Sequence, residues 1–211
     1  MDFMTKIRKN SGALHKAAES NGFIKRIVDG NASTESYCEY LFNLSAMYKC
    51  IESTLNENVD NDVIKDFVTL ELYRSDLIEK DLEFLVGDKT ESMELLPSTI
   101  AFVNRINDLR ESNPELVVAH AYTRFLADLF GGRTFESILG KKYNIPTEGL
   151  NYYSCDKIKD IRSYVMNYGS KLNAIDLDDD SKNSFINEIS NSYIYNIAIS
   201  TELEAKLYSS K

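Results

Sequence analysis

The chain has few of the residues on which strand-and-turn folds and disulfide scaffolds depend. Its 211 residues include only 9 glycines, 3 prolines, 3 cysteines and no tryptophan. All-β folds use glycine and proline at their corners, so this scarcity disfavours them. Cys38, Cys50 and Cys155 are odd in number and form no CxxC motif. They argue against a disulfide framework or a zinc site and favour buried thiols in a reducing compartment.

The sequence also lacks a long apolar run and an excess of basic residues. No stretch approaches the roughly 18 to 20 apolar residues of a membrane-spanning helix. Residues 1–15 contain no apolar stretch typical of a secretory signal. We therefore expect a cytoplasmic protein without a membrane anchor. The formal charge of −9, from 24 basic and 33 acidic residues, argues against nucleic acid as a partner.

Hydrophobic residues make up 43% of the chain and recur at helical spacing. That fraction is enough for one core, so we expect a single domain over 1–211. Apolar stripes with a spacing of three or four residues predict helices. Such stripes cover residues 14–27, 37–51, 63–84, 100–106, 161–172 and 185–207. The sequence therefore predicts an all-α bundle of seven or eight helices.

Sequence signals mark where the predicted helices begin. Ser33 or Thr34, Asn113 and Asp178 are the expected caps, and Pro97 and Pro114 open their segments. The segment after Pro114, residues 116–132, is the most apolar in the chain, which predicts a largely buried helix. It ends in Gly131 and Gly132, and each glycine costs a helix about 1 kcal/mol relative to alanine. The pair indicates a helix end, a kink, or backbone lying against something flat.

Four polar residues are considered for a role in chemistry. His15 and Glu19 are four residues apart, which places them on one helix face, where a carboxylate can orient a metal-binding imidazole. Taken alone, a histidine at such a position is more often a surface residue than a metal ligand. We expect His120, in an apolar segment, to be a buried and hydrogen-bonded core residue. Asp128, three residues before Gly131 and among apolar neighbours, must be paired, hydrated or functional.

Several common catalytic motifs are missing from the sequence. There is no HExxH motif and no Glu-x-x-His pair, which disfavours a di-iron carboxylate bundle. There is also no glycine-rich phosphate loop and no GxSxG motif.

One segment resembles a family signature. AHAYTRFLADLFGGR, residues 119–133, is similar to the signature of heme oxygenases, and the similarity continues in order along most of the chain. Leu14-His15 with Glu19 resembles the axial-histidine helix of that family. Four further stretches resemble its later helices: LFNLSAMYKCIE (41–52), ELYRSDLIEKDLEFL (71–85), YGSKLNAI (168–175) and YIYNIAIS (193–200).

The resemblance implies a heme-oxygenase-like all-α fold with heme between a proximal and a distal helix. It makes His15 the ligand of the heme iron, with Glu19 near its other ring nitrogen. The other implied site residues are the distal-helix positions Ala127, Gly131 and Gly132, the water-network residues Asp128, Arg124 and Tyr48, and the propionate contacts Tyr122 and Arg8. Ala127 stands where the family usually has glycine.

The resemblance also implies the reaction. Heme b would be both substrate and cofactor, cleaved with O2 and electrons to biliverdin, carbon monoxide and ferrous iron. No flavin or nicotinamide motif is present, so the electrons would come from an external donor. Residues 1–26 carry six basic and two acidic side chains, a face suited to an acidic ferredoxin, a flavodoxin or an NADPH-dependent reductase. The resemblance does not fix the physiological purpose, such as iron acquisition.

Some positions depart from the family pattern, and alternatives follow from them. Phe130 stands where serine is usual, and Gly12 and Gly169 replace basic residues that help to hold the propionates. The orientation of heme, and with it the biliverdin isomer, is left open. A non-catalytic heme carrier or sensor with the same pocket is the alternative function. A different enzyme of the same architecture, such as a thiaminase-like hydrolase with a cysteine nucleophile, is a third hypothesis.

Overall fold

A computed structural model describes residues 1–208 of the chain. This part contains eight α-helices, six short 3-10 turns and no strand, which confirms the all-α prediction. The helices are α1 (Phe3–Glu19), α2 (Gly22–Asp29), α3 (Thr34–Glu57), α4 (Ser75–Val86), α5 (Pro97–Ser112), α6 (Val117–Lys142), α7 (Ile161–Asn173) and α8 (Asp179–Tyr208).

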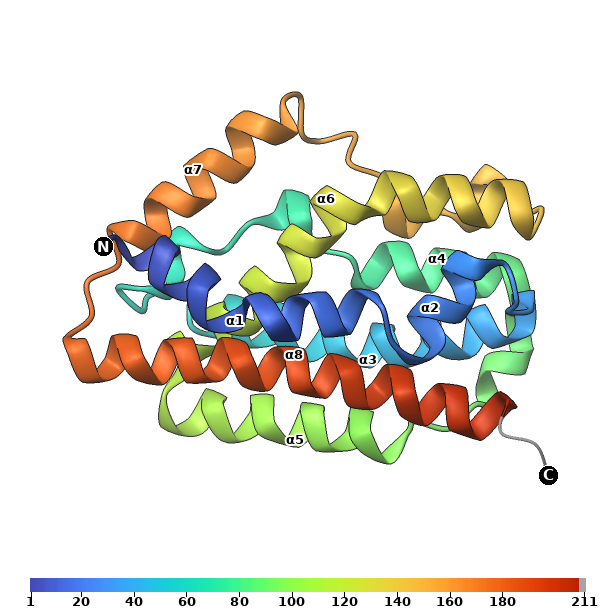
Figure 1. The fold of residues 1–211 in the computed structure, drawn as a ribbon, viewed down its shortest axis with the longest axis horizontal. Helices are drawn as coiled ribbons and strands as arrows, with labels where there is room; N and C mark the ends of the chain where they lie inside the picture. The colour runs from blue at the N-terminus through green and yellow to red at the C-terminus, as the bar shows by residue number, and fades with distance from the viewer. Residues whose placement is uncertain (209–211) are drawn as a thin grey trace.

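Helix α8 is the longest element and organises the others around it. Helices α1, α2, α5 and α6 all pack against it, and α3 packs against α4 and α5. In Figure 1, α8 crosses the molecule with α1 and α2 along one side and α5 along the other. Helix α6 bends near its middle. Helix α7 packs against α1. This arrangement leaves α1 facing the middle of α6.

Most predicted helix starts are confirmed, each for a local reason. The Ser33 hydroxyl accepts the backbone N–H of Ser36 in a capping box at the start of α3. The Asp178 carboxylate accepts the N–H of Ser181 at 2.7 Å before the first turn of α8. Asn113 is the N-cap residue and Pro114 the first residue of a 3-10 turn, Pro114–Leu116, but the Asn113 side chain makes no capping hydrogen bond. This turn leads directly into α6.

The stripe over residues 63–84 is not one helix. It contains two 3-10 turns, Ile64–Asp66 and Leu70–Leu72, and only then α4. The buried Glu52 carboxylate on α3 accepts the backbone N–H groups of Arg74 and Ser75, at 2.6 and 3.2 Å. These bonds satisfy donors at the first turn of α4 and so fix where the helix begins.

The stripe over residues 14–27 is also divided, between α1 and α2. Gly22 has a φ of +54°, and a Cβ there would lie 2.6 Å from the carbonyl oxygen of Ser200. Only glycine allows this backbone conformation together with such close contact to α8. In contrast, α6 continues through Gly131 and Gly132 to Lys142, so the glycine pair does not end the helix.

His120 is buried and hydrogen-bonded, as expected. Its Nε2 lies 2.8 Å from the Glu188 carboxylate on α8, which also accepts two bonds from Arg105 on α5. Glu188 therefore connects α8 to α6 through His120 and to α5 through Arg105. Among residues 1–208, no helix combines the length and the apolar character needed to cross a membrane.

Candidate active site

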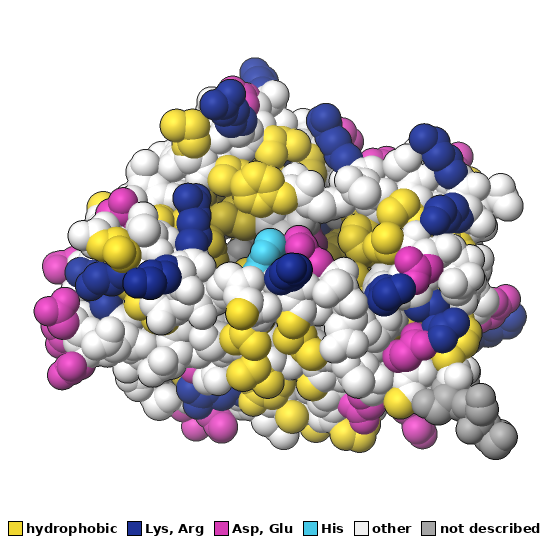
Figure 2. Space-filling model, in the orientation of Figure 1, with side chains coloured by type: hydrophobic (Ala, Val, Ile, Leu, Met, Phe, Trp, Pro, Cys, Tyr) yellow, Lys and Arg dark blue, Asp and Glu magenta, His cyan; other side chains and the backbone are white. Residues whose placement is uncertain are grey.

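A cavity of about 570 Å³ lies between α1 and α6, with further walls from α3, α7, α8 and the 3-10 turn Asn151–Tyr153. Its volume falls within the usual range for small-molecule sites. Figure 2 shows a hollow in the middle of one face with a histidine at its edge. Nine of the ten sequence-predicted site residues line the cavity: Arg8, His15, Glu19, Tyr122, Arg124, Ala127, Asp128, Gly131 and Gly132. The tenth, Tyr48, is fully buried behind Asp128.

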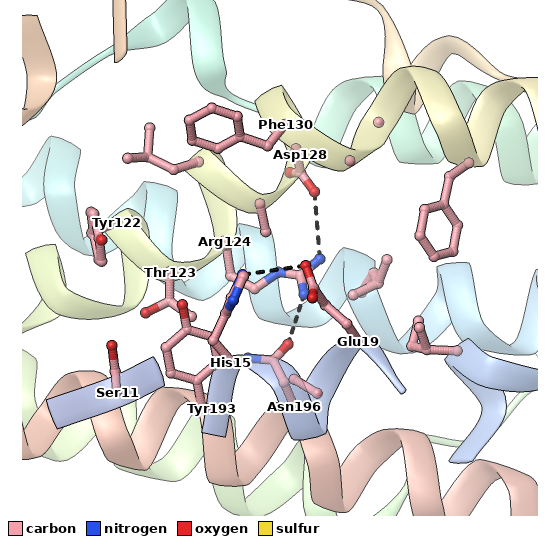
Figure 3. A pocket seen from close by; sticks show the side chains of 18 of the residues that line it. Ser11, His15, Glu19, Tyr122, Thr123, Arg124, Asp128, Phe130, Tyr193 and Asn196 are labelled. Atoms are coloured by element: carbon pink, nitrogen blue, oxygen red, sulfur yellow. Dashed lines mark hydrogen bonds and ion pairs between the residues drawn. The ribbon is translucent and has the colours of Figure 1, made fainter. Parts of the chain in front are cut away.

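Helix α1 supplies the imidazole. The His15 side chain is 49% exposed, and its Nε2 lies 3.4 Å from Oε1 of Glu19, one turn further along. The ring of Tyr193 from α8 meets the imidazole edge-on, with the ring centres 5.6 Å apart. The imidazole is therefore accessible from the cavity while a carboxylate and an aromatic ring limit its orientation (Figure 3).

Helix α6 supplies the opposite wall, which includes Gly131 and Gly132. A Cβ added at Gly131 would meet no atom within 4 Å beyond its chain neighbours and the backbone of its own helix. A Cβ added at Gly132 would meet only the ring of Tyr153, at 3.6 Å. A flat ligand can therefore approach the helix backbone here more closely than side chains would allow.

Asp128 is the acidic group of this wall. Its side chain is 9% exposed and each of its oxygens accepts a phenol hydrogen bond. The Tyr48 hydroxyl donates to Oδ2, and the Tyr152 hydroxyl donates to Oδ1 at 2.7 Å. Two guanidinium groups lie further away, Arg124 at 3.7 Å and Arg74 at 4.0 Å. These donors and positive charges compensate the cost of burying the carboxylate.

Arg124 connects Asp128 to the rest of the cavity. Its guanidinium donates to the Tyr48 hydroxyl at 3.2 Å and to the Tyr152 hydroxyl at 3.0 Å. It also donates to Oδ1 of Asn196 at 2.7 Å (Figure 3). Burial raises the pKa of both tyrosines well above the usual range, so both hydroxyls keep their protons. A cationic arginine and two neutral phenols thus surround one carboxylate.

One end of the cavity is lined by Arg8 and Tyr122. Arg8 is solvent-exposed, and burial raises the pKa of the Tyr122 phenol. A Cβ at Gly12 would meet nothing within 4 Å, and one at Gly169 would meet only Met4, at 3.9 Å. Gly12 and Gly169 offer no positive charge to an anionic ligand. Arg8 is the basic side chain that α1 contributes to the cavity wall.

Sequence reasoning missed three residues around Asp128. Asn196 could have been found from the sequence, because it is a polar residue within the apolar stripe of the last helix. Tyr152 lies in a short turn without periodicity, which gave no signal. Arg74 lies in the stretch expected to be one helix, and its burial (1% exposed) could not be expected for an arginine.

Other kinds of chemistry find little support among residues 1–208. No group of three or more histidine, cysteine, aspartate or glutamate side chains is arranged to hold a metal ion there. Burial raises the pKa of Cys38 and of Cys50 to about 12, which makes both poor nucleophiles. Cys155 is half-buried with its Sγ 3.6 Å from Arg74, and no general base within the described part of the chain forms a hydrogen bond with it. A cysteine-dependent hydrolase is therefore not supported.

The chain is similar to known proteins along almost its whole length. The family model described as heme oxygenase matches residues 1–202. A heme oxygenase of Guillardia theta is 32% identical, with 94% of this chain and 84% of the relative covered. A heme oxygenase of Porphyra purpurea is 33% identical, with 95% of this chain and 86% of the relative covered.

Solved structures give the same result. Heme oxygenase from Leptospira interrogans is 31% identical, with a TM-score of 0.90 over 96% of this chain and 100% of that one. Heme oxygenase-1 from Synechocystis sp. PCC 6803 in complex with heme is 26% identical, with a TM-score of 0.92 over 98% of this chain and 94% of that one.

Proposed function

This chain belongs to the heme oxygenase family and is an enzyme that cleaves heme, and on that premise we propose the roles of the residues around its cavity. Heme binds between α1 and α6, with His15 as the ligand of its iron. The observation that carries this proposal is the accessible imidazole of His15 on one wall and the glycine-bearing backbone of α6 on the other.

The residues present fit this substrate. The cavity wall is mainly apolar, as a porphyrin requires, and the open space above Gly131 admits a flat ring against the helix. Neutral imidazole is a common ligand of heme iron. When bound, heme supplies both the iron that activates O2 and the porphyrin that is cleaved.

Glu19 orients the ligand. The His15 ring is half-exposed, and a turn of the ring would place one nitrogen toward the cavity and the other toward Glu19. A carboxylate that accepts the N–H of the second nitrogen fixes the tautomer and raises the basicity of the first. Glu19 would thus strengthen the bond that His15 makes.

Asp128 orients water and passes protons on the opposite side. Arg124 and the phenols of Tyr48 and Tyr152 hold its carboxylate in place. Part of that carboxylate lines the cavity, where it can accept a hydrogen bond from an ordered water. Because Gly131 and Gly132 carry no side chain, the water and O2 have room beside the helix backbone. Ala127 narrows the same wall by one methyl group.

The substrate's two propionates face the end of the cavity lined by Arg8 and Tyr122. The guanidinium of Arg8 offers them charge-assisted bonds and the Tyr122 hydroxyl one further donor. The products are biliverdin, carbon monoxide and ferrous iron. Electrons come from an acidic ferredoxin, flavodoxin or reductase that docks on the basic face of residues 1–26, in the cytoplasm.

A single-turnover experiment tests the function. Hemin is bound to the protein, and the complex is reduced in air with ascorbate or with a ferredoxin system while the absorbance spectrum is followed. We expect the Soret band to bleach and biliverdin to be extracted in about one equivalent per heme. A complex that keeps its Soret band under both donors would favour the carrier or sensor instead.

A further inference from the structure

The hydroxyl of Tyr152 lies at the centre of the polar contacts behind Asp128. It donates to Oδ1 of Asp128 at 2.7 Å and accepts from Arg124 at 3.0 Å. It also lies 3.2 Å from the hydroxyl of Tyr48. Tyr152 lines the cavity, whereas Tyr48 lies behind it. Of the two phenols that hold Asp128, Tyr152 is therefore the one at the cavity surface.

Two phenols hold a carboxylate differently from one. With Tyr48 alone on Oδ2, the Asp128 carboxylate could rotate about its last side-chain bond, a torsion with a broad energy minimum. The second bond, from Tyr152 to Oδ1, fixes that rotation and leaves a defined set of lone pairs toward the cavity. The same hydroxyl occupies one donor of Arg124, so it sets the position of both charges.

The position of Tyr152 is itself fixed from outside the cavity. Asp81 on α4 is fully buried, and its Oδ2 accepts the backbone N–H of Tyr152 at 2.8 Å. Its Oδ1 accepts the backbone N–H and the side-chain amide of Asn151, at 2.7 and 2.9 Å. These three bonds anchor a 3-10 turn that has little hydrogen bonding of its own.

We propose that Tyr152 is a positioning residue for heme cleavage, which orients Asp128 and Arg124, and that Asp81 acts on the same site through the turn that carries Tyr152. This inference rests on the proposed function of the cavity. It assigns to the hydroxyl of Tyr152 a role in proton delivery, and it connects a buried carboxylate on α4 to the side of the cavity opposite His15.

Removal of the Tyr152 hydroxyl has a defined consequence. In Tyr152→Phe, Oδ1 of Asp128 loses its donor and Arg124 loses an acceptor, while the ring still fills the same space. The negative charge of Asp128 is then less compensated beside the heme. A less compensated carboxylate opposes the gain of another negative charge nearby. The absorbance spectrum of the ferric heme complex can be followed as the pH is changed. The pH at which the spectrum is half converted, its midpoint, should therefore rise.

The chain offers a matched control in the neighbouring residue. Tyr153 is also buried, but its hydroxyl faces Tyr37 at 3.4 Å and makes no bond to Asp128. Tyr152→Phe and Tyr153→Phe each remove one buried hydroxyl, so any effect of general destabilisation is common to both. Only Tyr152→Phe removes a contact of Asp128.

The test measures the absorbance spectrum of the ferric heme complex as a function of pH, with hemin affinity measured in parallel. We expect the midpoint to rise by about half a pH unit in Tyr152→Phe, as the loss of one hydrogen bond would give. Hemin Kd should stay within about threefold of the parent value. Asp81→Asn should raise the midpoint in the same direction, and Tyr153→Phe should leave it in place.

The outcomes separate this inference from the proposed function. If the parent binds and cleaves heme but Tyr152→Phe keeps the parental midpoint, or shifts no more than Tyr153→Phe, the positioning role is wrong. If the parent does not bind hemin, the proposed function fails first. Should Asp81→Asn not fold, Tyr152→Phe still decides the role of Tyr152, and Asp81→Glu, which keeps the carboxylate but displaces it, decides that of Asp81.

Discussion

Asp128 shows at the residue scale how burial and chemistry are combined. A carboxylate with 9% exposure would be costly to bury alone, and here two phenols and two arginines surround it. Part of it still lines the cavity. Buried charges that keep access to a cavity are frequent at catalytic sites, which is why this residue is assigned to proton delivery.

Asp128→Ala should therefore keep heme but lose its productive cleavage. The variant retains His15 and the glycines of α6, so hemin affinity should change little. Loss of a positioned proton relay lowers rates by about 10²-fold or more. The measurement is biliverdin yield after a single turnover. Asp108→Ala, at an exposed site on α5, is the control, and a parental yield from Asp128→Ala would contradict the assignment.

Residues differ in how far the sequence could reveal them. His15 with Glu19 follows from helical spacing, and the conflict between charge and apolar neighbours singled out Asp128. Tyr152 could not be found in this way, because it reaches Asp128 only through the fold, from a turn held by Asp81. Long-range polar contacts of this kind leave no periodic signal.

Helix α6 carries two opposing demands at the element scale. Its length and apolar character make it a core helix, while Gly131 and Gly132 weaken it in its middle. Because a Cβ at Gly131 would lie in open space, packing does not explain this glycine, and we attribute it to the proposed heme site.

Gly131→Ala should consequently stabilise the free protein and weaken heme binding. Alanine raises helix stability by up to about 1 kcal/mol, while its methyl group occupies space against the cavity. Gly140→Ala on the same helix, where a Cβ makes only an ordinary 3.7 Å contact, is the control. Thermal unfolding and hemin titration of both variants check this. Equal hemin affinities would remove Gly131 from the binding surface.

The His120–Glu188 pair joins α6 to α8 and makes stability depend on pH. Burial lowers the pKa of His120, and its Nδ1 has no partner among the described residues, so a protonated ring would leave a buried N–H unsatisfied. Burial opposes ionisation of Glu188, but bonds from His120 and Arg105 lower its pKa to about 2. Folding therefore favours neutral His120 and ionised Glu188.

The free energy of unfolding should fall in acid in two stages. Below pH 6.5, the ordinary pKa of a histidine, the unfolded chain binds a proton that the folded chain does not, which costs at most about 1.4 kcal/mol per pH unit. The Glu188 contribution is present above pH 4.5 and is lost as the pH falls from 4.5 toward 2. Denaturant unfolding between about pH 7 and 5 measures the first stage. His120→Gln should remove its part of the slope, and an unchanged slope would show that His120 binds its proton equally in the folded and the unfolded chain.

The helices themselves were predictable to different degrees. Helix start signals and apolar stripes predicted α3, α5, α7 and α8, because each of these helices packs apolar residues at helical spacing against the core. The stretch over residues 63–84 was wrongly predicted as one helix, because its apolar residues belong first to two 3-10 turns and then to α4. The start of α4 is fixed by Glu52 from a different helix, a tertiary constraint that overrides local periodicity.

Charge is distributed unevenly at the scale of the whole molecule. The chain carries −9 overall, yet residues 1–26 are net basic, and they form α1 and part of α2 beside the cavity. An acidic donor would be repelled by most of the surface and attracted to this face. The uneven charge could be predicted from the sequence, but its place beside the cavity depends on how the helices pack.

The rate of electron delivery from an acidic ferredoxin should fall as salt is added. Screening shortens the reach of exposed charges to about 10 Å at 0.1 M ionic strength. Lys9→Glu, on the exposed side of α1, should slow delivery and weaken its salt dependence, whereas Lys80→Glu on α4 should do neither. Stopped-flow reduction of the ferric heme complex measures both. Equal effects of the two variants would place the donor elsewhere.

The central claim is that heme lies between α1 and α6 with its iron on His15. A crystal structure of the protein with heme, together with the spectrum of His15→Ala, tests it most directly. We expect an imidazole nitrogen of His15 on the iron, the backbone of Gly131 and Gly132 against the other face, and loss of the histidine-ligated spectrum in the variant. Iron held by another group, or heme bound elsewhere, would contradict it.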